Sequence, residues 1–307
     1  MFRGISLRFR GAIWLVAVAA LAGFGGGCVR VSTKTNVPAA QVLHSLDATK
    51  AELIEKYNKQ AAAIQSLNAT VTLTPTAGSQ YSGVIEQYHE VNGFILATRP
   101  ANIRVIGQAP VVAKNIFDMV SDGETFRIFI PSKNKFMVGS AELERPTEKP
   151  IENIRPQHLL DALLWPEIPA GASVVIAEDD ELAARYYILS VLSKGASPEI
   201  ERNLWFDRSD LNLARVQIYG AAGKLISDIR LDGWQPAAPA ASTATVNGNL
   251  EYPRHITMQR PHDDYKLEIK VKKVSLNESI ADDRFHLEQP PGTELVKVGE
   301  PGAGKEQ

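Results

Sequence analysis

The clearest pattern in the chain is the strict alternation of apolar and charged residues from Tyr265 to Lys272. Leu267, Ile269 and Val271 point to one side of such a strand, and the lysines and the glutamate between them point to the other. One solvent-exposed face and one buried face are typical of strands in an antiparallel sheet. This stretch therefore predicts a sheet that buries one of its two faces.

Other short stretches of alternating or β-branched residues follow one another along the chain, separated by turn signals such as Asn92-Gly93. The spacing predicts strands over 68–74, 81–89, 93–98, 102–107, 115–121, 125–130, 136–139, 173–177, 184–192, 200–206, 214–219, 224–231, 250–260 and 264–275. Parallel units would need about ten to fifteen helical residues between most strands, and the chain lacks them. The pattern predicts an antiparallel meander.

Two stretches carry helical spacing instead. Apolar residues recur at steps of three and four between Val42 and Ile64, which predicts one amphipathic helix over 39–65. Pro156 opens a second, strongly apolar helix over 157–165, and Pro166 ends it. Two helices are too few to cover so many strands, so the sheet must curl around them. The Ala- and Pro-rich stretch 235–248 predicts a flexible loop.

The first residues have the organisation of an export signal. Arg3, Arg8 and Arg10 precede an apolar run that ends in Gly26-Gly27-Cys28. The run is shorter than the roughly 20 residues that a spanning helix needs. Cys28 resembles the acylated cysteine of a bacterial lipobox, although Gly25 stands where that motif usually has an aliphatic residue. The alternative is an ordinary cleaved signal with a cysteine nearby.

These patterns divide the chain into a signal peptide (1–27), a tether (28–38), a folded domain (39–295) and a disordered tail (296–307). Without residues 1–27 the chain keeps 30 basic and 35 acidic residues, a formal net charge of −5. A nucleic-acid partner is not expected, because binding phosphates requires a basic excess or a basic stripe. With Cys28 as the only cysteine, stability must come from packing and not from disulfides.

The sequence carries no recognisable catalytic or cofactor motif. His89-Glu90 begins a zinc-protease pattern, but Gly93 stands where the second histidine would be required. His255, His262, Asp263 and Asp264 have the residue types of a metal cluster, yet Pro261 and the aspartates are typical of a hairpin turn. We expect a non-enzymatic protein with no metal site and no cofactor.

Three stretches resemble the LolA/LolB superfamily of lipoprotein carriers and lipoprotein-sorting proteins. They are a helix that leads directly into a strand (57–74), the segment 204–219 followed by Gly223-Lys224-Leu225, and the closing segment 274–292 with its Leu276-Asn277 and Pro291-Gly292. The resemblance covers roughly residues 40–295. It implies an α+β fold, in which a curved antiparallel sheet forms an incomplete (half) β-barrel with helices covering its concave face.

Such a fold has an apolar groove, whose helix around 159–165 would be a movable lid. Acyl chains could enter it at about 0.8 kcal/mol per buried CH₂ group. Strand alternation selects ten candidate lining residues: Phe126, Ile128, Ile130, Leu204, Phe206, Val216, Ile218, Leu267, Ile269 and Val271. The sequence leaves open whether the groove is open, filled by side chains or collapsed.

The leading hypothesis is a membrane-anchored lipoprotein that faces the periplasm and binds lipid or lipoprotein acyl chains, with a role in envelope lipid or lipoprotein trafficking. Its membrane contact would be the acyl chains on Cys28. An aspartate directly after this cysteine would resemble an inner-membrane retention signal; the chain has Val29 there, which favours the outer membrane. The alternative is a structural or adaptor lipoprotein that binds an envelope protein through a sheet edge or the loop 235–248.

Overall fold

The computed structural model describes residues 44–79, 84–111, 114–141, 153–180, 184–239 and 250–298. The predicted signal peptide, Cys28 and the tether lie outside these residues. All described residues belong to one compact unit that begins at His44. Within them, no helix is long and apolar enough to cross a membrane.

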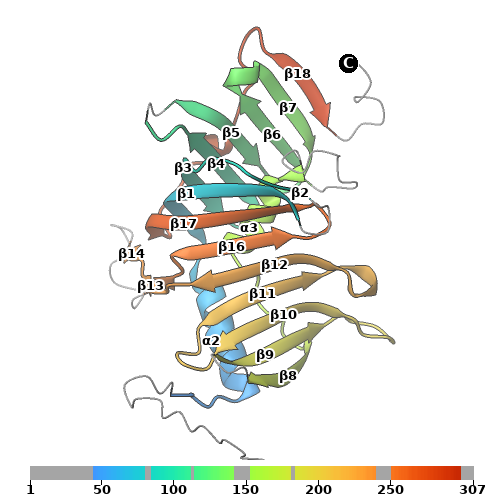
Figure 1. Cartoon of the computed structure of the whole chain (residues 1–307). Coiled ribbons are helices and arrows are strands. Elements are labelled where there is room, and N and C mark those ends of the chain that lie inside the picture. The colour runs from blue at the N-terminus through green and yellow to red at the C-terminus, as the bar shows by residue number, and fades with distance from the viewer. Residues whose placement is uncertain are drawn as a thin grey trace, which may run out of the picture. The chain divides into compact units, whose positions relative to one another are not determined.

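One large sheet dominates this unit (Figure 1). Among the described residues it contains 16 strands, in the order β18-β7-β6-β5-β4-β3-β1-β17-β16-β12-β11-β10-β9-β8, with β2 beside β1 and β14 beside β17. The strands are β1 (Ser66–Ser79), β2 (Val84–Gln87), β3 (Val91–Thr98), β4 (Asn102–Gln108), β5 (Asn115–Ser121), β6 (Thr125–Ile130), β7 (Lys135–Ser140), β8 (Ser173–Asp180), β9 (Arg185–Leu192), β10 (Ile200–Asp207), β11 (Leu213–Tyr219), β12 (Leu225–Asp232), β14 (Ala238–Pro239), β16 (His255–Arg260), β17 (Tyr265–Leu276) and β18 (Glu294–Val298).

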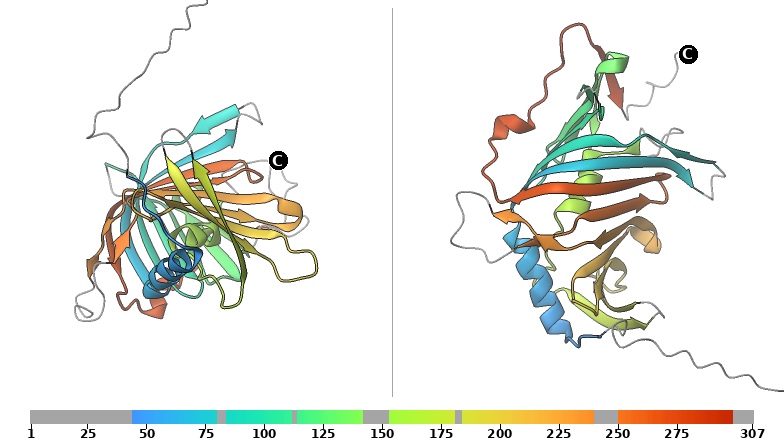
Figure 2. Two further views of the ribbon diagram at one scale, coloured as in Figure 1. Left: turned by 90° about the horizontal axis from the view of Figure 1, so that it is seen from below. Right: turned by 60° about the vertical axis from the view of Figure 1, so that its left-hand side comes forward.

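The sheet is open and curved: β18 and β8 form its two edges and do not meet (Figure 2). Neighbouring strands pair antiparallel except at β18–β7 and β14–β17. The predicted α+β class with an open, curved antiparallel sheet is therefore confirmed. Strands β13 (Gln235–Pro236) and β15 (Glu251–Tyr252) form a separate antiparallel pair. The first two residues of the predicted loop 235–248 therefore lie in a strand. Residues 240–249 lie outside the described part.

Strand register places the buried apolar residues on one face of the sheet. A continuous cross-strand row runs through Leu189, Leu204, Val216, Ile229, Met258 and Leu267. Each of these side chains is at most 4% exposed. Because side chains alternate along a strand, the intervening residues face the other side. We call the side with this row the apolar face.

The first helix is shorter than the sequence pattern predicts. Helix α2 spans Lys50–Ala63, and residues 44–49 are not helical. Thr49 forms a capping box with Glu52: its hydroxyl accepts from the Glu52 amide, and the Glu52 carboxylate accepts from the Thr49 amide. This cap begins the helix at Lys50 although the apolar spacing continues upstream.

The second helix, α3, spans Pro156–Leu163, close to the predicted 157–165. Pro156 is its first residue, and its N-cap, Arg155, makes no side-chain capping hydrogen bond. In the described residues, α2 and α3 supply the α-helical contacts to the apolar face, and α3 lies against β4 and β5.

The predicted disordered tail is wrong at its start. Residues 294–298 form β18, which pairs in parallel with β7. The Glu294 amide donates to the Asn134 carbonyl at 2.9 Å, and the Asn134 side-chain amide donates to the Gly292 carbonyl at 2.9 Å. Backbone pairing with an open sheet edge orders this segment, although its composition lacks a strong strand pattern. Residues 299–307 lie outside the described part.

A candidate ligand site between the sheet and helix α3

The predicted lining residues fall into two groups. Seven are buried, at no more than 6% exposure: Phe126, Leu204, Phe206, Val216, Leu267, Ile269 and Val271. Six of the seven belong to one apolar cluster; Phe126 is buried outside it, with the guanidinium of Arg155 4.6 Å from its ring centre. Ile128 and Ile218 are half-buried against the cluster, and Ile130 is half-buried apart from it.

The two helices contribute the other side of the same cluster. From α2 come Leu53, Tyr57 and Ala61, and from α3 come Leu159, Leu160, Ala162 and Leu163. The Tyr57 ring meets the Phe206 ring edge-on, with centres 6.4 Å apart. The apolar face is therefore in contact with helical side chains of the same chain. Any apolar ligand on this face must replace some of those contacts.

Arg99 joins the ends of the two helices. Its guanidinium donates to the carbonyls of Ile64 at 2.9 Å, Ala61 at 3.2 Å and Trp165 at 2.7 Å. The first two carbonyls lie at the C-terminal end of α2, where a cation is favourable for the helix dipole. The third belongs to the segment that follows α3. One side chain thus holds both helices at this point.

The chain just after α3 is held by further side chains from α2 and β10. The Tyr57 hydroxyl donates to the Pro166 carbonyl at 2.8 Å, and burial raises the pKa of this hydroxyl to about 12. Arg202 donates to the same carbonyl at 2.9 Å and to the Glu167 carbonyl at 2.7 Å. These bonds leave residues 166 and 167 little freedom to move.

Two more contacts complete the C-terminal clamp, by which we mean the side-chain bonds to residues 163–168. Asn58 bonds to Ile168 twice, accepting from its amide at 2.8 Å and donating to its carbonyl at 3.0 Å. The buried Tyr252 hydroxyl donates to the Leu163 carbonyl at 2.9 Å. The clamp therefore reaches back to the last residue of α3.

The N-terminal end of α3 is held differently. His158 Nδ1 and the Tyr265 hydroxyl are joined by a hydrogen bond of 2.7 Å, and their rings stack with centres 6.3 Å apart. Burial, with Arg260 and Arg155 nearby, lowers the pKa of His158 to about 2, so the imidazole is neutral at physiological pH. Burial also raises the pKa of Tyr265.

Asp161 lies one turn further along α3 and is half-buried. Burial raises the pKa of its carboxyl to about 6, and the opposing effect of Arg260 does not compensate. Arg260 is instead bound to Asp263, with Nε 2.5 Å from Oδ2. We call α3 residues His158 and Asp161, together with their neighbours Arg260 and Tyr265, the seat of α3. At neutral pH this seat thus contains a carboxylate whose charge is poorly compensated.

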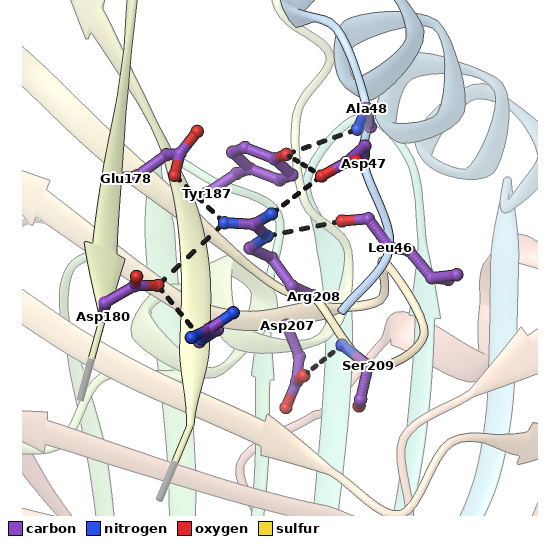
Figure 3. A network of polar contacts seen from close by, with 10 residues as sticks. Leu46, Asp47, Ala48, Glu178, Asp180, Tyr187, Asp207, Arg208 and Ser209 are labelled. Carbon is purple, nitrogen blue, oxygen red and sulfur yellow. Dashed lines mark hydrogen bonds and ion pairs between the residues drawn. The ribbon is translucent and has the colours of Figure 1, made fainter. Parts of the chain in front are cut away.

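A separate network fixes the chain where it enters α2 (Figure 3). Arg208 donates to Asp47 at 2.8 Å, to Glu178 at 3.0 Å and to the Leu46 carbonyl at 3.3 Å, and its guanidinium lies 4.6 Å from the Tyr187 ring centre. The Leu46 amide donates back to the Arg208 carbonyl at 2.6 Å. These contacts tie residues 46–47 to β8, β9 and the turn after β10.

Two of the four residues considered for metal binding have other partners. His255 Nδ1 lies 2.7 Å from Asp232 Oδ1, and Asp263 is bound to Arg260. Over the described ranges, no group of three or more His, Cys, Asp or Glu side chains is arranged to hold a metal ion.

Sequence reasoning missed Arg99, Asp161 and the roles of Arg208 and Asn277. Arg208 and Asn277 fall inside the two motifs that resemble the carrier superfamily, and this was the available signal. Asn277 has a positive φ of 61°, accepts from the Gln65 amide at 2.8 Å and donates to the Ala63 carbonyl at 2.7 Å. It thereby closes the C-terminal end of α2. No local pattern marks Arg99 or Asp161, because their partners are distant in sequence.

The sequence matches no protein-family model and no curated protein. Among solved structures, the chain is similar to a LolA superfamily protein from Nitrosomonas europaea, with 13% identity, a TM-score of 0.45, and coverage of 78% of this chain and 99% of that chain. A DUF1329 family protein from Desulfovibrio piger has 10% identity, a TM-score of 0.48, and coverage of 76% and 94%. A domain named for outer membrane lipoprotein sorting, from Vibrio parahaemolyticus, has 8% identity, a TM-score of 0.44, and coverage of 76% and 95%. This likeness concerns the fold alone.

Proposed function

We propose that this chain is a lipoprotein of the cell envelope that binds acyl chains of lipids or lipoproteins and catalyses no reaction. It would be anchored through Cys28, face the periplasm from the outer membrane, and act in lipid or lipoprotein trafficking. The observation that carries the proposal is the unequal fixation of α3. This short apolar helix covers part of the apolar face. Side chains from α2, β10 and the β3–β4 turn bond to the backbone at its C-terminal end, whereas its N-terminal end has no side-chain cap.

The proposed movement follows from that asymmetry. The clamp bonds to residues 163–168. The start of α3 has no side-chain cap; the described contacts there include apolar packing, the His158–Tyr265 bond and the Arg155 guanidinium against the Phe126 ring. Leu164, at φ −130° and ψ 84°, is the first non-helical residue and the natural hinge. When α3 swings out about Leu164, Leu159 and Leu160 leave the apolar face and an acyl chain takes their place.

Burial supplies the affinity in this scheme. Each CH₂ group of an acyl chain that leaves water contributes about 0.8 kcal/mol. The loss of the Leu159 and Leu160 contacts offsets part of this gain. We take the apolar face to be the concave face of the curved sheet, covered by α2 and α3, so that a bound chain would be enclosed on several sides.

The test is acyl-chain uptake by delipidated protein. The Cys28→Ser variant, which cannot be acylated, is titrated with fluorescent monoacylglycerols of increasing chain length. We expect saturable binding whose affinity rises with chain length, and faster exchange of the α3 amides in the bound state. If delipidated protein takes up no acyl ligand of any length, the proposal is wrong.

The anchor is tested separately. Mass spectrometry of protein isolated from membranes should find Cys28 as the acylated N-terminal residue. A chain that begins elsewhere, with Cys28 unmodified or removed, would contradict the anchored form while leaving acyl binding to be judged by the uptake experiment.

A second candidate is an adaptor lipoprotein that binds an envelope protein. It is favoured by the edge strand β8, which pairs only with β9 among the described strands and exposes Val175 and Ile176 at 52% and 36%. An exposed edge of this kind can accept a strand from another chain. A stable protein partner that is recovered without bound lipid, and lost in a Val175→Lys variant, would support this role.

A further inference from the structure

The indole of Trp165 is a deeply buried aromatic donor just after α3. The residue is 2% exposed, and its ring packs against Trp234 and Tyr252, with ring centres 5.7 Å and 6.0 Å away. Its carbonyl is held by Arg99. The position of the indole is thus determined both by its backbone and by two neighbouring rings.

The Nε1–H of this indole is buried and has no hydrogen-bond acceptor within the described part of the chain. The other described tryptophans differ: Trp205 donates to the Gln217 side chain at 3.0 Å, and Trp234 donates to the Leu213 carbonyl at 3.1 Å. A buried donor without an acceptor is costly, and native proteins rarely keep one. The indole of Trp165 therefore has room for an acceptor that is supplied from outside the described residues.

Trp165 would remain in place during the movement proposed for α3. It follows the hinge residue Leu164 and precedes Pro166, whose carbonyl is held by Tyr57 and Arg202. Swinging α3 away would open the apolar face beside Trp165 and leave the indole itself clamped. A ligand that replaces Leu159 and Leu160 would thus come to lie next to a fixed, unpaired donor.

We infer that Trp165 Nε1–H donates to the carbonyl oxygen of the bound acyl group. This inference rests on the proposed function and specifies its ligand: an esterified or amidated acyl chain, as in a glycerolipid or an acylated protein. An ionised fatty acid is disfavoured, because burying its carboxylate in this apolar surrounding would cost far more than one hydrogen bond returns. A hydrocarbon or an alkyl ether has no carbonyl oxygen, so it would leave Trp165 Nε1–H without this acceptor.

The experiment compares two ligands that differ only in the carbonyl, 1-tetradecanoylglycerol and 1-O-tetradecylglycerol, with delipidated Cys28→Ser protein. We expect the ester to bind about 2- to 13-fold more tightly, the range that one net hydrogen bond gives. Trp165→Phe keeps an aromatic ring without the N–H, so it should bind both ligands with equal affinity. Trp234→Phe is the matched control and should keep the preference for the ester, since its indole is already paired.

A second measurement does not depend on a variant's stability. The indole N–H resonance of Trp165 should move downfield when the ester binds and should not do so when the ether binds. Adding N-tetradecanoylserinol distinguishes the two kinds of carbonyl: tighter binding of this amide indicates an amide-linked acyl chain, and tighter binding of the ester indicates an ester-linked one.

Equal affinity of wild-type protein for ester and ether would overturn the inference, as would an ester preference that survives in Trp165→Phe. In both cases acyl binding itself would stand. Failure of the wild-type protein to bind either ligand is a different result, which counts against the proposed function.

Discussion

The guanidinium of Arg99 donates to the carbonyl of Trp165 at 2.7 Å, although the two residues are 66 positions apart. The same group donates to Ala61 and Ile64 at the end of α2. Arg99 therefore connects α2, the turn between β3 and β4, and the segment after α3. Because this connection lies beside the proposed hinge, its removal should affect both stability and ligand exchange.

Replacing Arg99 with lysine should lower the free energy of unfolding by about 2–3 kcal/mol. A lysine ammonium can reach one or two of the three carbonyls, and the rest lose their donor in a partly buried place. Urea unfolding measures the loss. Arg230→Lys, at an exposed position of β12, is the control and should change stability by less than about 0.5 kcal/mol. Equal losses in the two variants would contradict the role assigned to Arg99.

Asn277 should tolerate glycine better than alanine. Both substitutions remove the bonds to Gln65 and Ala63, which we expect to cost about 1–2 kcal/mol. Alanine should lower the free energy of unfolding by about 1 kcal/mol or more in addition, because φ is 61° here and a left-handed backbone is unfavourable for a residue with a Cβ. Thermal and urea unfolding of the two variants should therefore separate them. If they are equally stable, the backbone conformation at Asn277 is not what the residue provides.

Asp161 should make the folded domain less stable as the pH rises from about 4 to about 6. Its pKa is about 6 in the fold and 3.8 in an unfolded chain, so the folded state holds more protons between these values. Asp161→Asn should be more stable than the wild type at pH 7, by up to about 3 kcal/mol, and the difference should vanish near pH 4.

The low pKa of His158 acts in the opposite direction, lowering stability as the pH falls below 6.5, where the unfolded imidazole takes up a proton. Both proteins in the comparison retain His158, so its contribution cancels. Urea midpoints measured for the pair from pH 4 to pH 8 test the prediction. A difference that is independent of pH would contradict it.

Substitutions in the seat of α3 should change acyl affinity in opposite directions. Asp161→Asn removes a poorly compensated charge and favours the seated helix, so acyl binding at pH 7 should weaken, by about fivefold for each 1 kcal/mol of added closure. His158→Ala removes the bond to Tyr265 and should strengthen binding. Glu55→Gln, an exposed charge change on α2, is the control. Titration with a fluorescent monoacylglycerol measures the affinity of all three variants. Changes of the same sign in the two α3 variants would refute the idea that α3 and the ligand compete.

Arg208→Lys should loosen the chain that enters α2. A lysine cannot bond to Asp47, Glu178 and the Leu46 carbonyl together, nor cover the Tyr187 ring in the same way. We expect faster hydrogen exchange at the amide of Ala48, which donates to the Tyr187 hydroxyl at 3.4 Å. Arg185→Lys, whose side chain is half-exposed and lies 3.5 Å from Asp180, should leave that exchange rate unchanged. Unaltered exchange in Arg208→Lys would show that the segment is held without this network.

Alternation along each strand was sufficient to predict the class of the sheet and the direction of most of its side chains. Leu204, Val216 and Leu267 were expected on one face and are joined in one cross-strand row. The prediction works because the period of two is a local property of the strand, and because a one-residue slip would expose every apolar side chain at once. The apolar helix that begins at Pro156 was also predictable, because the proline at its start and the apolar residues that follow are local features of the sequence.

Tertiary structure decided where α2 begins, how α3 is held and which donor is left unpaired. The apolar spacing predicts helix from residue 39, but the capping box of Thr49 and Glu52, together with Arg208 holding Leu46 and Asp47, starts α2 at Lys50. Arg99 and Asn277 act through bonds that span 66 and 214 positions. Such bonds form only after the sheet has brought distant segments together. The sequence by itself therefore determined an antiparallel sheet with one apolar face, while the clamp on α3 and the unpaired indole of Trp165 exist only because the folded chain brings distant segments together.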